Sequence, residues 1–322
     1  MNAILNSAAL RETVLGLPDV ADWPEVEGLF DAQETTPRMD WQLPTRACLA
    51  VGGTETAALP AVAAIACLQI SIILVDDILD NDPRGEYHRL GEGRAANIAL
   101  AFEAAALDLL ARAPVDGERR ALACAAVARA ALTTARGQDL DVQNLRGEEN
   151  YWRVVKTKST PFYGVAFQSG ALLGGASPQV AQGLYEVGVL LGEMVQVFDD
   201  LLDAFATPAN PDWREGRNNL ALLYASTAEH PQRDVFRGML GHVEDAASLQ
   251  AAQQILVTCG AVSYCVYLLA RRVEAVRRLL RSLNLPDPEP VWFPIAQEIK
   301  PLTNWLERLG LPVPAELAGE TL

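Results

Sequence analysis

Residues 57–80 read AALPAVAAIACLQISIILVDDILD, an apolar stretch that ends in the three aspartates Asp76, Asp77 and Asp80. Side chains four positions apart share one face of a helix, so Asp76 and Asp80 should lie together with Asp77 beside them. Like charges at this spacing destabilise a helix by roughly 0.2–0.5 kcal/mol per pair, and apolar surroundings add a desolvation penalty. The stretch therefore predicts a buried central helix that ends in a cation-binding carboxylate cluster.

The same signature occurs again 123 positions later (199 minus 76), where Asp199, Asp200 and Asp203 end a second apolar run. One copy alone is best interpreted as solvated charge at a helix end, but two copies favour a shared site. Oxygen ligands without nearby His or Cys favour Mg²⁺, with Mn²⁺ as a possible substitute. The six aspartates are therefore the predicted metal ligands.

The composition favours an all-α fold, because half of the 322 residues are apolar, only 7% are aromatic, and Ala and Leu are abundant. Apolar residues recur every three to four positions without competing period-2 alternation. Further helices are expected at about 94–113, 117–138, 147–174, 178–206, 217–227, 246–258 and 260–284. We predict one helical-bundle domain over residues 1–322, with its core at about 40–285 and a short C-terminal helix at about 293–309.

Charge and cysteine content exclude several classes of protein. The net charge of −15 argues against a nucleic-acid partner, since phosphate binding needs clustered Lys and Arg. Five cysteines without a CxxC motif fit reduced thiols in a cytoplasmic protein. The uncharged stretch 57–75 approaches the length of a membrane span, but Pro60, Gln69 and Ser71 interrupt it, so no transmembrane segment is expected. The first residues do not form an export signal.

Several further motifs lie between and after the two aspartate clusters. They are Gly137-Gln138-Asp139-Leu140-Asp141, Lys156-Thr157, Gln168-Ser169-Gly170-Ala171, Gln196-Val197-Phe198-Asp199-Asp200 and Asp212-Trp213-Arg214-Glu215-Gly216-Arg217-Asn218-Asn219-Leu220. In this order and spacing the chain resembles the trans-isoprenyl diphosphate synthase family, which includes the farnesyl and geranylgeranyl diphosphate synthases, over about residues 40–285. The resemblance implies the isoprenoid synthase fold with a central active-site cavity, prenyl diphosphate substrates, and a homodimer. The Ala-rich helix at 117–136 is a candidate for the dimer interface.

The family's chemistry is the loss of diphosphate from an allylic prenyl diphosphate. Developing charge on the leaving group needs metal ions and cations. The resemblance assigns Lys156 to that diphosphate, with Thr157 and Gln196 as polar neighbours, and places Arg217 where the family has a second lysine. The cation that forms needs an apolar cavity that excludes water.

The departures from the family pattern concern the second diphosphate, that of isopentenyl diphosphate. Arg46 is kept, but Leu43 stands in the lysine position before it. Arg84 is kept after the first motif, but a second arginine is absent. A Gly-Lys pair after the second motif is replaced by Ala206-Thr207, whereas Gln69 stands where the family uses His or Gln. Metal-assisted ionisation is therefore better supported by the sequence than condensation.

Three functions remain open from the sequence. The first is a prenyltransferase that condenses an allylic diphosphate with isopentenyl diphosphate. The second is a terpene synthase on the same fold that cyclises a preformed prenyl diphosphate or quenches it with water. The third is a non-catalytic subunit of a prenyl synthase, which six intact carboxylates argue against. Ser71 and Ile72, one helical turn before Asp76, are expected to face the prenyl chain. Because neither residue is aromatic, a geranylgeranyl-sized substrate or product is predicted.

Overall fold

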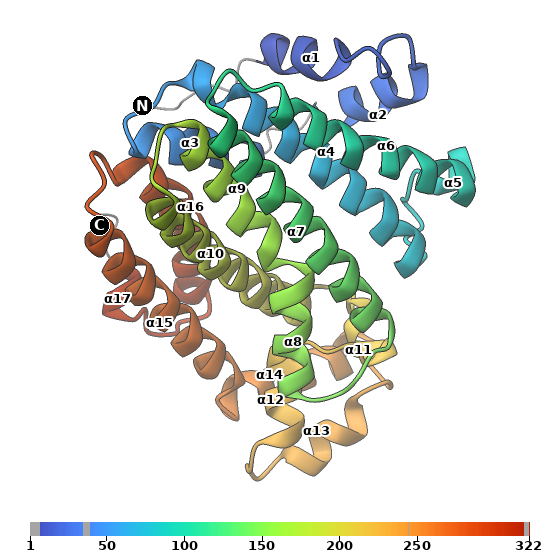
Figure 1. Cartoon of the computed structure of the whole chain (residues 1–322). Coiled ribbons are helices and arrows are strands. Elements are labelled where there is room, and N and C mark those ends of the chain that lie inside the picture. Colours follow the sequence, from blue (N-terminus) through green and yellow to red (C-terminus); the bar gives the residue numbers. More distant parts are fainter. Residues whose placement is uncertain (1–6, 35–38, 244, 319–321) are drawn as a thin grey trace.

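Every regular element in the described part of the chain is helical. The computed structural model describes residues 7–34, 39–243, 245–318 and 322, and no strand occurs among them (Figure 1). This confirms the predicted all-α class. The first six residues, which the predicted domain 1–322 includes, lie outside the described residues.

The apolar stretch before the first aspartate motif forms helix α4 (Glu55–Asp80). The Thr54 hydroxyl accepts the N–H of Ala57 at 3.2 Å and caps the start of the helix. The helix ends at Asn81, which has a left-handed φ of 54°. By length and apolarity α4 could cross a membrane. Helices α14 and α15, which meet at a 54° bend, pass the same test if they are taken together. However, 67% of the most apolar window of α4 is buried in the fold. Helix α4 is therefore best described as a core helix.

Four long helices form the bundle together with α4; three of them contact α4, and the fourth, α10, packs on α9 (Figure 1). They are α6 (Glu92–Ala111), α7 (Gly117–Val142), α9 (Thr160–Leu173) and α10 (Pro178–Phe205). Helix α9 contacts α4, α7 and α10 and so lies between the two helices that carry the aspartate motifs. The buried apolar side chains of these helices belong to one hydrophobic cluster.

The single helix predicted for residues 147–174 is in fact two helices. Helix α8 (Glu148–Lys158) ends at Ser159, and α9 begins at Thr160. Pro161 explains the break, because it has no N–H to donate to the carbonyl of Thr157 and it disfavours helical backbone at the residue before it. The break turns the last residues of α8 toward the bundle, where they contribute to the site described below.

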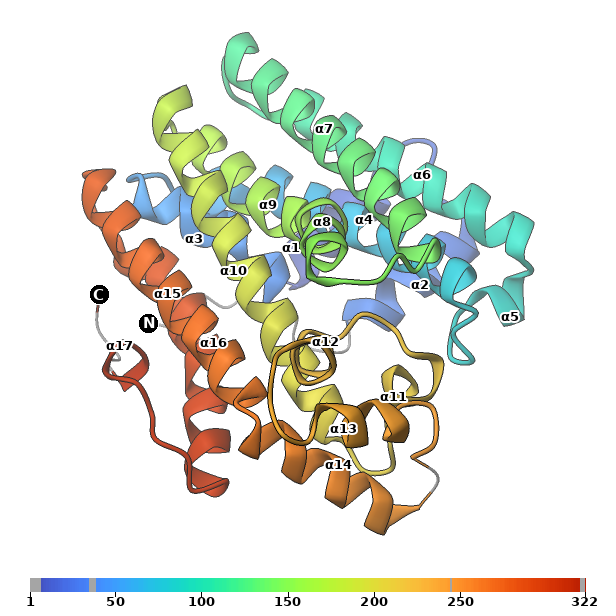
Figure 2. The same cartoon turned by 90° about the horizontal axis from the view of Figure 1, so that it is seen from below.

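Shorter helices gather around the C-terminal end of α10 (Figure 2). They are α11 (Pro211–Glu215), α12 (Leu220–Thr227), α13 (Arg233–Met239) and α14 (Ala246–Thr258). Helix α13 was not expected from the sequence, and the helix predicted at 217–227 starts only at Leu220. Asn219 caps α12 by accepting the N–H groups of Ala221 and Leu222.

The N-terminal and C-terminal segments pack against the long helices (Figure 1). The N-terminal elements are α1 (Ser7–Leu15), α2 (Pro24–Glu34), the 3₁₀ turn η1 (Asp40–Gln42) and α3 (Leu43–Ala50), and α5 (Tyr87–Leu90) follows α4. The C-terminal elements are α15 (Ala261–Ser282), α16 (Glu289–Arg308) and α17 (Ala315–Ala318). Helix α3 lies buried between α4, α9 and α16. Helix α16 is 20 residues long and begins at Glu289, four residues before the predicted start at about 293. Pro290 fits its first turn, where a missing N–H is no loss.

A glycine sets the distance between α7 and the end of α8. A Cβ atom added to Gly137 would lie 2.3 Å from the backbone nitrogen of Lys158, so any larger residue would force the two backbones apart. Because only glycine permits this approach, the residues after Gly137 on α7 come close to Lys158.

Candidate active site

Lys158 is the centre of the first aspartate cluster. Its Nζ lies 2.7 Å from Asp76 Oδ1 on α4, 2.7 Å from Asp141 Oδ2 on α7, and 4.0 Å from Asp80 Oδ2. Burial would lower the pKa of this lysine, but the nearby charges of Asp76 and Asp141 outweigh burial and raise it. Lys158 therefore stays charged and is the counter-ion of three carboxylates.

The structure places the Lys156 and Thr157 side chains outside the first aspartate cluster. Lys156 is exposed and has no ion pair among the described residues, because two positions in a helix turn a side chain by about 200° to the opposite face. The Thr157 hydroxyl donates to the carbonyl of Arg153 within α8. Lys158 and Ser159, two positions later, occupy the site instead, and the Ser159 hydroxyl donates to Gln196 Oε1 at 3.1 Å.

The second motif has one buried and two accessible aspartates. Asp200 is only 4% exposed, and its two oxygens accept the Gln196 amide at 3.1 Å and the N–H of Leu220 at 2.8 Å. Asp199 is exposed and Asp203 is partly exposed. The structure therefore favours Asp199 and Asp203 as metal ligands, whereas Asp200, predicted as a ligand, joins α10 to the start of α12.

The two motifs are joined through adjacent residues at the α8–α9 break. Lys158 reaches α4 at Asp76, and Ser159 reaches Gln196 on α10, the helix of the second motif. A second connection comes from the loop between α11 and α12, where Arg217 Nη1 lies 3.5 Å from Asp80 Oδ2. Lys158 and Ser159 thus connect α4 with α10, and two cations lie at the first motif; that the two motifs form one shared site stays a prediction.

Crowding of carboxyl groups changes their acidity on both sides. Burial, helped by Asp82 and Asp76, raises the pKa of Asp77 to about 6. The surroundings of Asp199 raise its pKa to about 6 through desolvation and the charges of Asp203 and Asp40, although the side chain itself reaches solvent. Such groups are stabilised when a divalent cation binds beside them.

The donors present fit Mg²⁺ that is shared with a substrate. Within the described ranges no three His, Cys, Asp or Glu side chains form a ready-made metal cage. This matches the usual habit of Mg²⁺, which takes one or two carboxylates and completes its shell with waters and phosphate oxygens. Asp141 is a further carboxylate that the sequence reasoning did not assign, although it ends the quoted Gly-Gln-x-x-Asp motif.

The residues expected at a second diphosphate have other partners. Gln69 Oε1 accepts the Trp41 indole N–H at 2.6 Å, and Gln69 Nε2 donates to Asp40 Oδ2 at 3.1 Å. Arg84 pairs with Asp82 at 2.8 Å on the surface. Arg46 is buried, and its guanidinium stacks on the Phe293 ring of α16 at 4.0 Å. The charge of Arg84 acts on Asp77 of the first motif and partly offsets the rise in its pKa, whereas no described hydrogen bond or ion pair joins Gln69 or Arg46 to the six motif aspartates.

The two predicted chain-length residues lie one turn before the first motif. Ser71 is buried and Ile72 is partly exposed. The Ile72 carbonyl accepts the Gln138 amide at 3.3 Å, and the same amide lies 3.4 Å from Asp76 Oδ1. Gln138 thus ties this turn of α4 to the metal-binding end, and the contact of either side chain with a prenyl tail stays a prediction.

Two aspartate motifs connected through Lys158 and Ser159, on a bundle of long helices, are the arrangement expected of an enzyme that acts on diphosphate substrates. Comparison with known proteins agrees, because the sequence pattern of the polyprenyl synthetase family matches residues 43–257. The chain belongs to this family.

Individual relatives support the assignment. The chain is 30% identical over 252 residues to the geranylgeranyl diphosphate synthase of Methanosarcina mazei, covering 73% of this chain and 76% of that protein. The solved geranylgeranyl pyrophosphate synthetase of Pyrococcus horikoshii has the same fold, with a TM-score of 0.78, 18% identity, and coverage of 93% and 95% of the two chains. A geranylgeranyl pyrophosphate synthase from Corynebacterium glutamicum, solved with calcium and isoprenyl diphosphate, gives a TM-score of 0.74 at 19% identity, with coverage of 95% and 94%.

Proposed function

We propose that this protein is a Mg²⁺-dependent isoprenyl diphosphate synthase, a prenyltransferase that ionises an allylic prenyl diphosphate and condenses it with isopentenyl diphosphate. The observation that carries the proposal is the junction at Lys158 and Ser159, which connects both aspartate motifs. The names of the relatives, which include a geranylgeranyl and a short-chain isoprenyl diphosphate synthase, support condensation and a product of about geranylgeranyl length.

The acidic residues would hold the metal on two sides of the departing diphosphate. Asp76, Asp77 and Asp80 with Asp141 form one side, and Asp199 and Asp203 form the other. When bound, Mg²⁺ supplies positive charge that offsets the charge developing on the leaving oxygens. Asp200 acts indirectly by fixing the end of α10.

The basic residues act on the same diphosphate. The allylic C–O bond breaks, its electron pair leaves with the diphosphate oxygen, and an allylic cation stays behind. Lys158 and Arg217 place fixed positive charge beside the first motif, where the leaving group gains charge. Attack by the double bond of isopentenyl diphosphate then forms the new C–C bond, and loss of a proton restores a double bond.

One observation favours the second candidate, a terpene synthase that needs no second diphosphate. Burial and the charges of Asp199 and Asp40 raise the pKa of Glu298 on α16 to about 7, so three acidic groups share this side of the site. Asp40 also holds the amide of Gln69. These acidic groups would repel a second diphosphate. They would not repel an uncharged double bond of the allylic chain or a water molecule.

The surface of α6 and α7 supports the proposed homodimer. Leu132 on α7 is 74% exposed and Leu100 on α6 is 66% exposed, on helices that pack together. Exposed alanines extend the stripe along α7 at Ala121, Ala125 and Ala128. Apolar side chains in such a row are typical of a surface that pairs with another protein. Sedimentation analysis of Leu132→Glu should show a dimer converted to monomers.

The proposed function is tested by the release of diphosphate. The protein should release diphosphate from farnesyl diphosphate in the presence of Mg²⁺, faster when isopentenyl diphosphate is added. Release that is equally fast without isopentenyl diphosphate would favour the terpene synthase. A folded protein that releases none from geranyl, farnesyl or geranylgeranyl diphosphate would contradict both.

A further inference from the structure

Side chains from α15 hold α8, the helix that ends at the first aspartate cluster. Trp152 lies on α8, six residues before Lys158, and the Arg272 guanidinium of α15 lies over its indole ring, 4.5 Å from the ring centre. The indole N–H donates to Glu148 Oε1 at 3.1 Å, and the same oxygen accepts the phenol O–H of Tyr264 on α15. Two side chains of α15 therefore contact the first half of α8.

Arg272 also reaches α10, the helix of the second aspartate motif. Its Nε donates to Glu193 Oε2 at 2.8 Å, and its Nη1 donates to the Leu268 carbonyl at 3.1 Å within α15. The side chains of Arg272 and Glu193 are only 14% and 9% exposed, so salt screens this ion pair little. A planar guanidinium donates from its edge while its face stacks on a ring. One buried side chain therefore links α8, α10 and α15.

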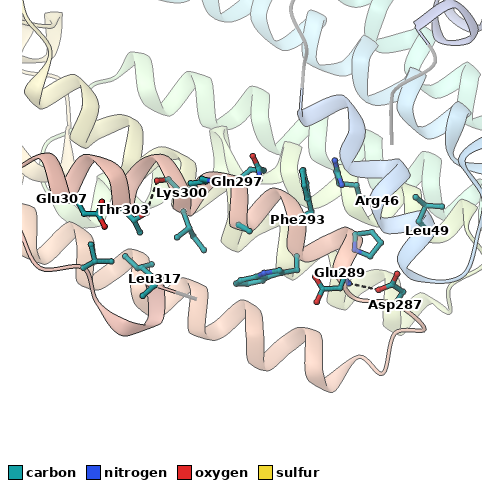
Figure 3. Close-up of a pocket in the computed structure, with 16 residues that line it drawn as sticks. Arg46, Leu49, Asp287, Glu289, Phe293, Gln297, Lys300, Thr303, Glu307 and Leu317 are labelled. Carbon is teal, nitrogen blue, oxygen red and sulfur yellow. Dashed lines mark hydrogen bonds between the residues drawn. The ribbon is translucent and has the colours of Figure 1, made fainter. Parts of the chain in front are cut away.

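The surroundings of Arg272 differ from those of Arg46, which also stacks on an aromatic ring. In Figure 3 Arg46 lies beside Phe293 at a groove along α16, a cavity of about 770 Å³. Arg272 instead has a carboxylate counter-ion inside the fold, Glu193. Replacing a buried ion pair with apolar residues is often neutral or stabilising, so stability alone does not account for this pair. Its directed contacts fix how the three helices lie relative to one another.

The Arg272 and Ser159 contacts attach α8 to α10 at two points. Glu193 and Gln196 are three positions apart, which places them on the same side of α10. At the end of α8, Gln196 accepts the Ser159 hydroxyl at 3.1 Å. In the middle of α8, Arg272 connects Trp152 to Glu193. One attachment would leave α8 free to turn about it, whereas two attachments fix its direction.

We propose that Arg272 is a positioning residue: by fixing the direction of α8, it keeps the charge of Lys158 where the leaving diphosphate gains charge. This inference rests on the proposed function, in which Lys158 acts on that diphosphate. A displacement of about 1 Å, caused by a change far from the chemistry, can lower a rate about 100-fold. Because the effect belongs to the transition state, kcat should fall while the Michaelis constant for the allylic diphosphate stays nearly unchanged.

Steady-state kinetics with Mg²⁺, farnesyl diphosphate and isopentenyl diphosphate test this role. Arg272→Met should lower kcat at least about tenfold and change the Michaelis constant for farnesyl diphosphate less than about threefold. Trp152→Leu, which removes the ring but keeps the ion pair, should give the same result, and adding it to Arg272→Met should cause little further loss. Arg271→Met is the matched control, because this neighbour is exposed and pairs with Glu274 at 3.7 Å on the surface. A normal kcat in folded Arg272→Met, or an equal loss in Arg271→Met, overturns the inference.

The double variant Glu193→Leu with Arg272→Leu separates positioning from stability. It removes both buried charges, so its unfolding temperature should be close to or above that of the wild type. Its kcat should nevertheless stay at least about tenfold low, because the link to Trp152 is absent. A wild-type kcat in this variant would show that the pair only stabilises the fold. If the double variant does not fold, Trp152→Leu decides, and its normal kcat would refute the positioning role.

Hydrogen exchange tests the inference without any activity. In Arg272→Met the amides of α8 should exchange at least about tenfold faster, because the helix loses a contact in its middle, whereas the amides of α6 should keep the wild-type rate. Unchanged exchange across α8 contradicts the inference on its own. A wild type that releases no diphosphate refutes the proposed function instead, so the two failures are distinguishable.

Discussion

Replacing Lys158 with methionine should separate the site found in the structure from the one that the sequence suggested. The methionine keeps most of the side-chain volume but removes the charge that Asp76 and Asp141 both contact at 2.7 Å. Each charge-assisted hydrogen bond contributes about 1.5–3 kcal/mol, and the partial exposure of Asp141 favours the lower values. A loss of about 2–4 kcal/mol in the transition state corresponds to a rate about 30- to 1000-fold lower.

The matched control is Lys156→Met, two residues away on the exposed face of α8. Its rate of diphosphate release should stay within about threefold of the wild type. Thermal unfolding adds a second readout: without metal, Lys158→Met should unfold at lower temperature, because three carboxylates lose their counter-ion, and Mg²⁺ should restore part of the loss. A large activity loss in Lys156→Met with a nearly normal Lys158→Met would refute the assignment.

Three further predictions concern the metal, acidity and chain length. Asp76→Ala or Asp199→Ala should lower diphosphate release at least about 100-fold, or about 3 kcal/mol, and EDTA should abolish it; full activity of either variant would remove that motif from the site. In metal-free protein, Asp77, Asp199 and Glu298 have pKa values raised to about 6, 6 and 7, above their unfolded values near 4, so the folded state holds more protons. Their contribution to the free energy of unfolding should therefore fall as pH rises from about 4 to 7, and Glu298→Gln should flatten that dependence in denaturant titrations; an unchanged slope would contradict it. Ser71→Phe should shorten the product toward farnesyl length, and an unchanged product from folded protein would show that this face of α4 does not contact the chain.

The parts of the fold that could be predicted are those with a strong local signal. The apolar run before Asp76 predicts a buried helix from local sequence alone, and the structure has α4 there. The helix break at Ser159 also has a local cause, Pro161, yet the apolar periodicity on both sides suggested one helix. The predicted start of α16 at about 293 came four residues late, because Pro290 lies in the opening turn, where proline is tolerated.

The site was less predictable, because it depends on how helices meet. Lys156 and Lys158 cannot be ranked from sequence spacing alone, since both lie in the last turn of α8, and only the approach of α7 at Gly137 selects Lys158. In the same way Asp200 is a typical metal-ligand residue by type, but one of its oxygens accepts the N–H of Leu220, 20 residues later. The position of Arg46 against Phe293 depends on a helix almost 250 residues away in the chain.

Mass spectrometry of the products tests the proposed function most directly. The protein is incubated with Mg²⁺ and farnesyl diphosphate, with and without isopentenyl diphosphate, and the wild type is compared with Asp76→Ala. We expect a prenyl diphosphate of geranylgeranyl length that forms only when both substrates and Mg²⁺ are present, and that is lost in the variant. A cyclic hydrocarbon or an alcohol formed from farnesyl diphosphate alone, with no isopentenyl unit added under either condition, would contradict the proposed condensation.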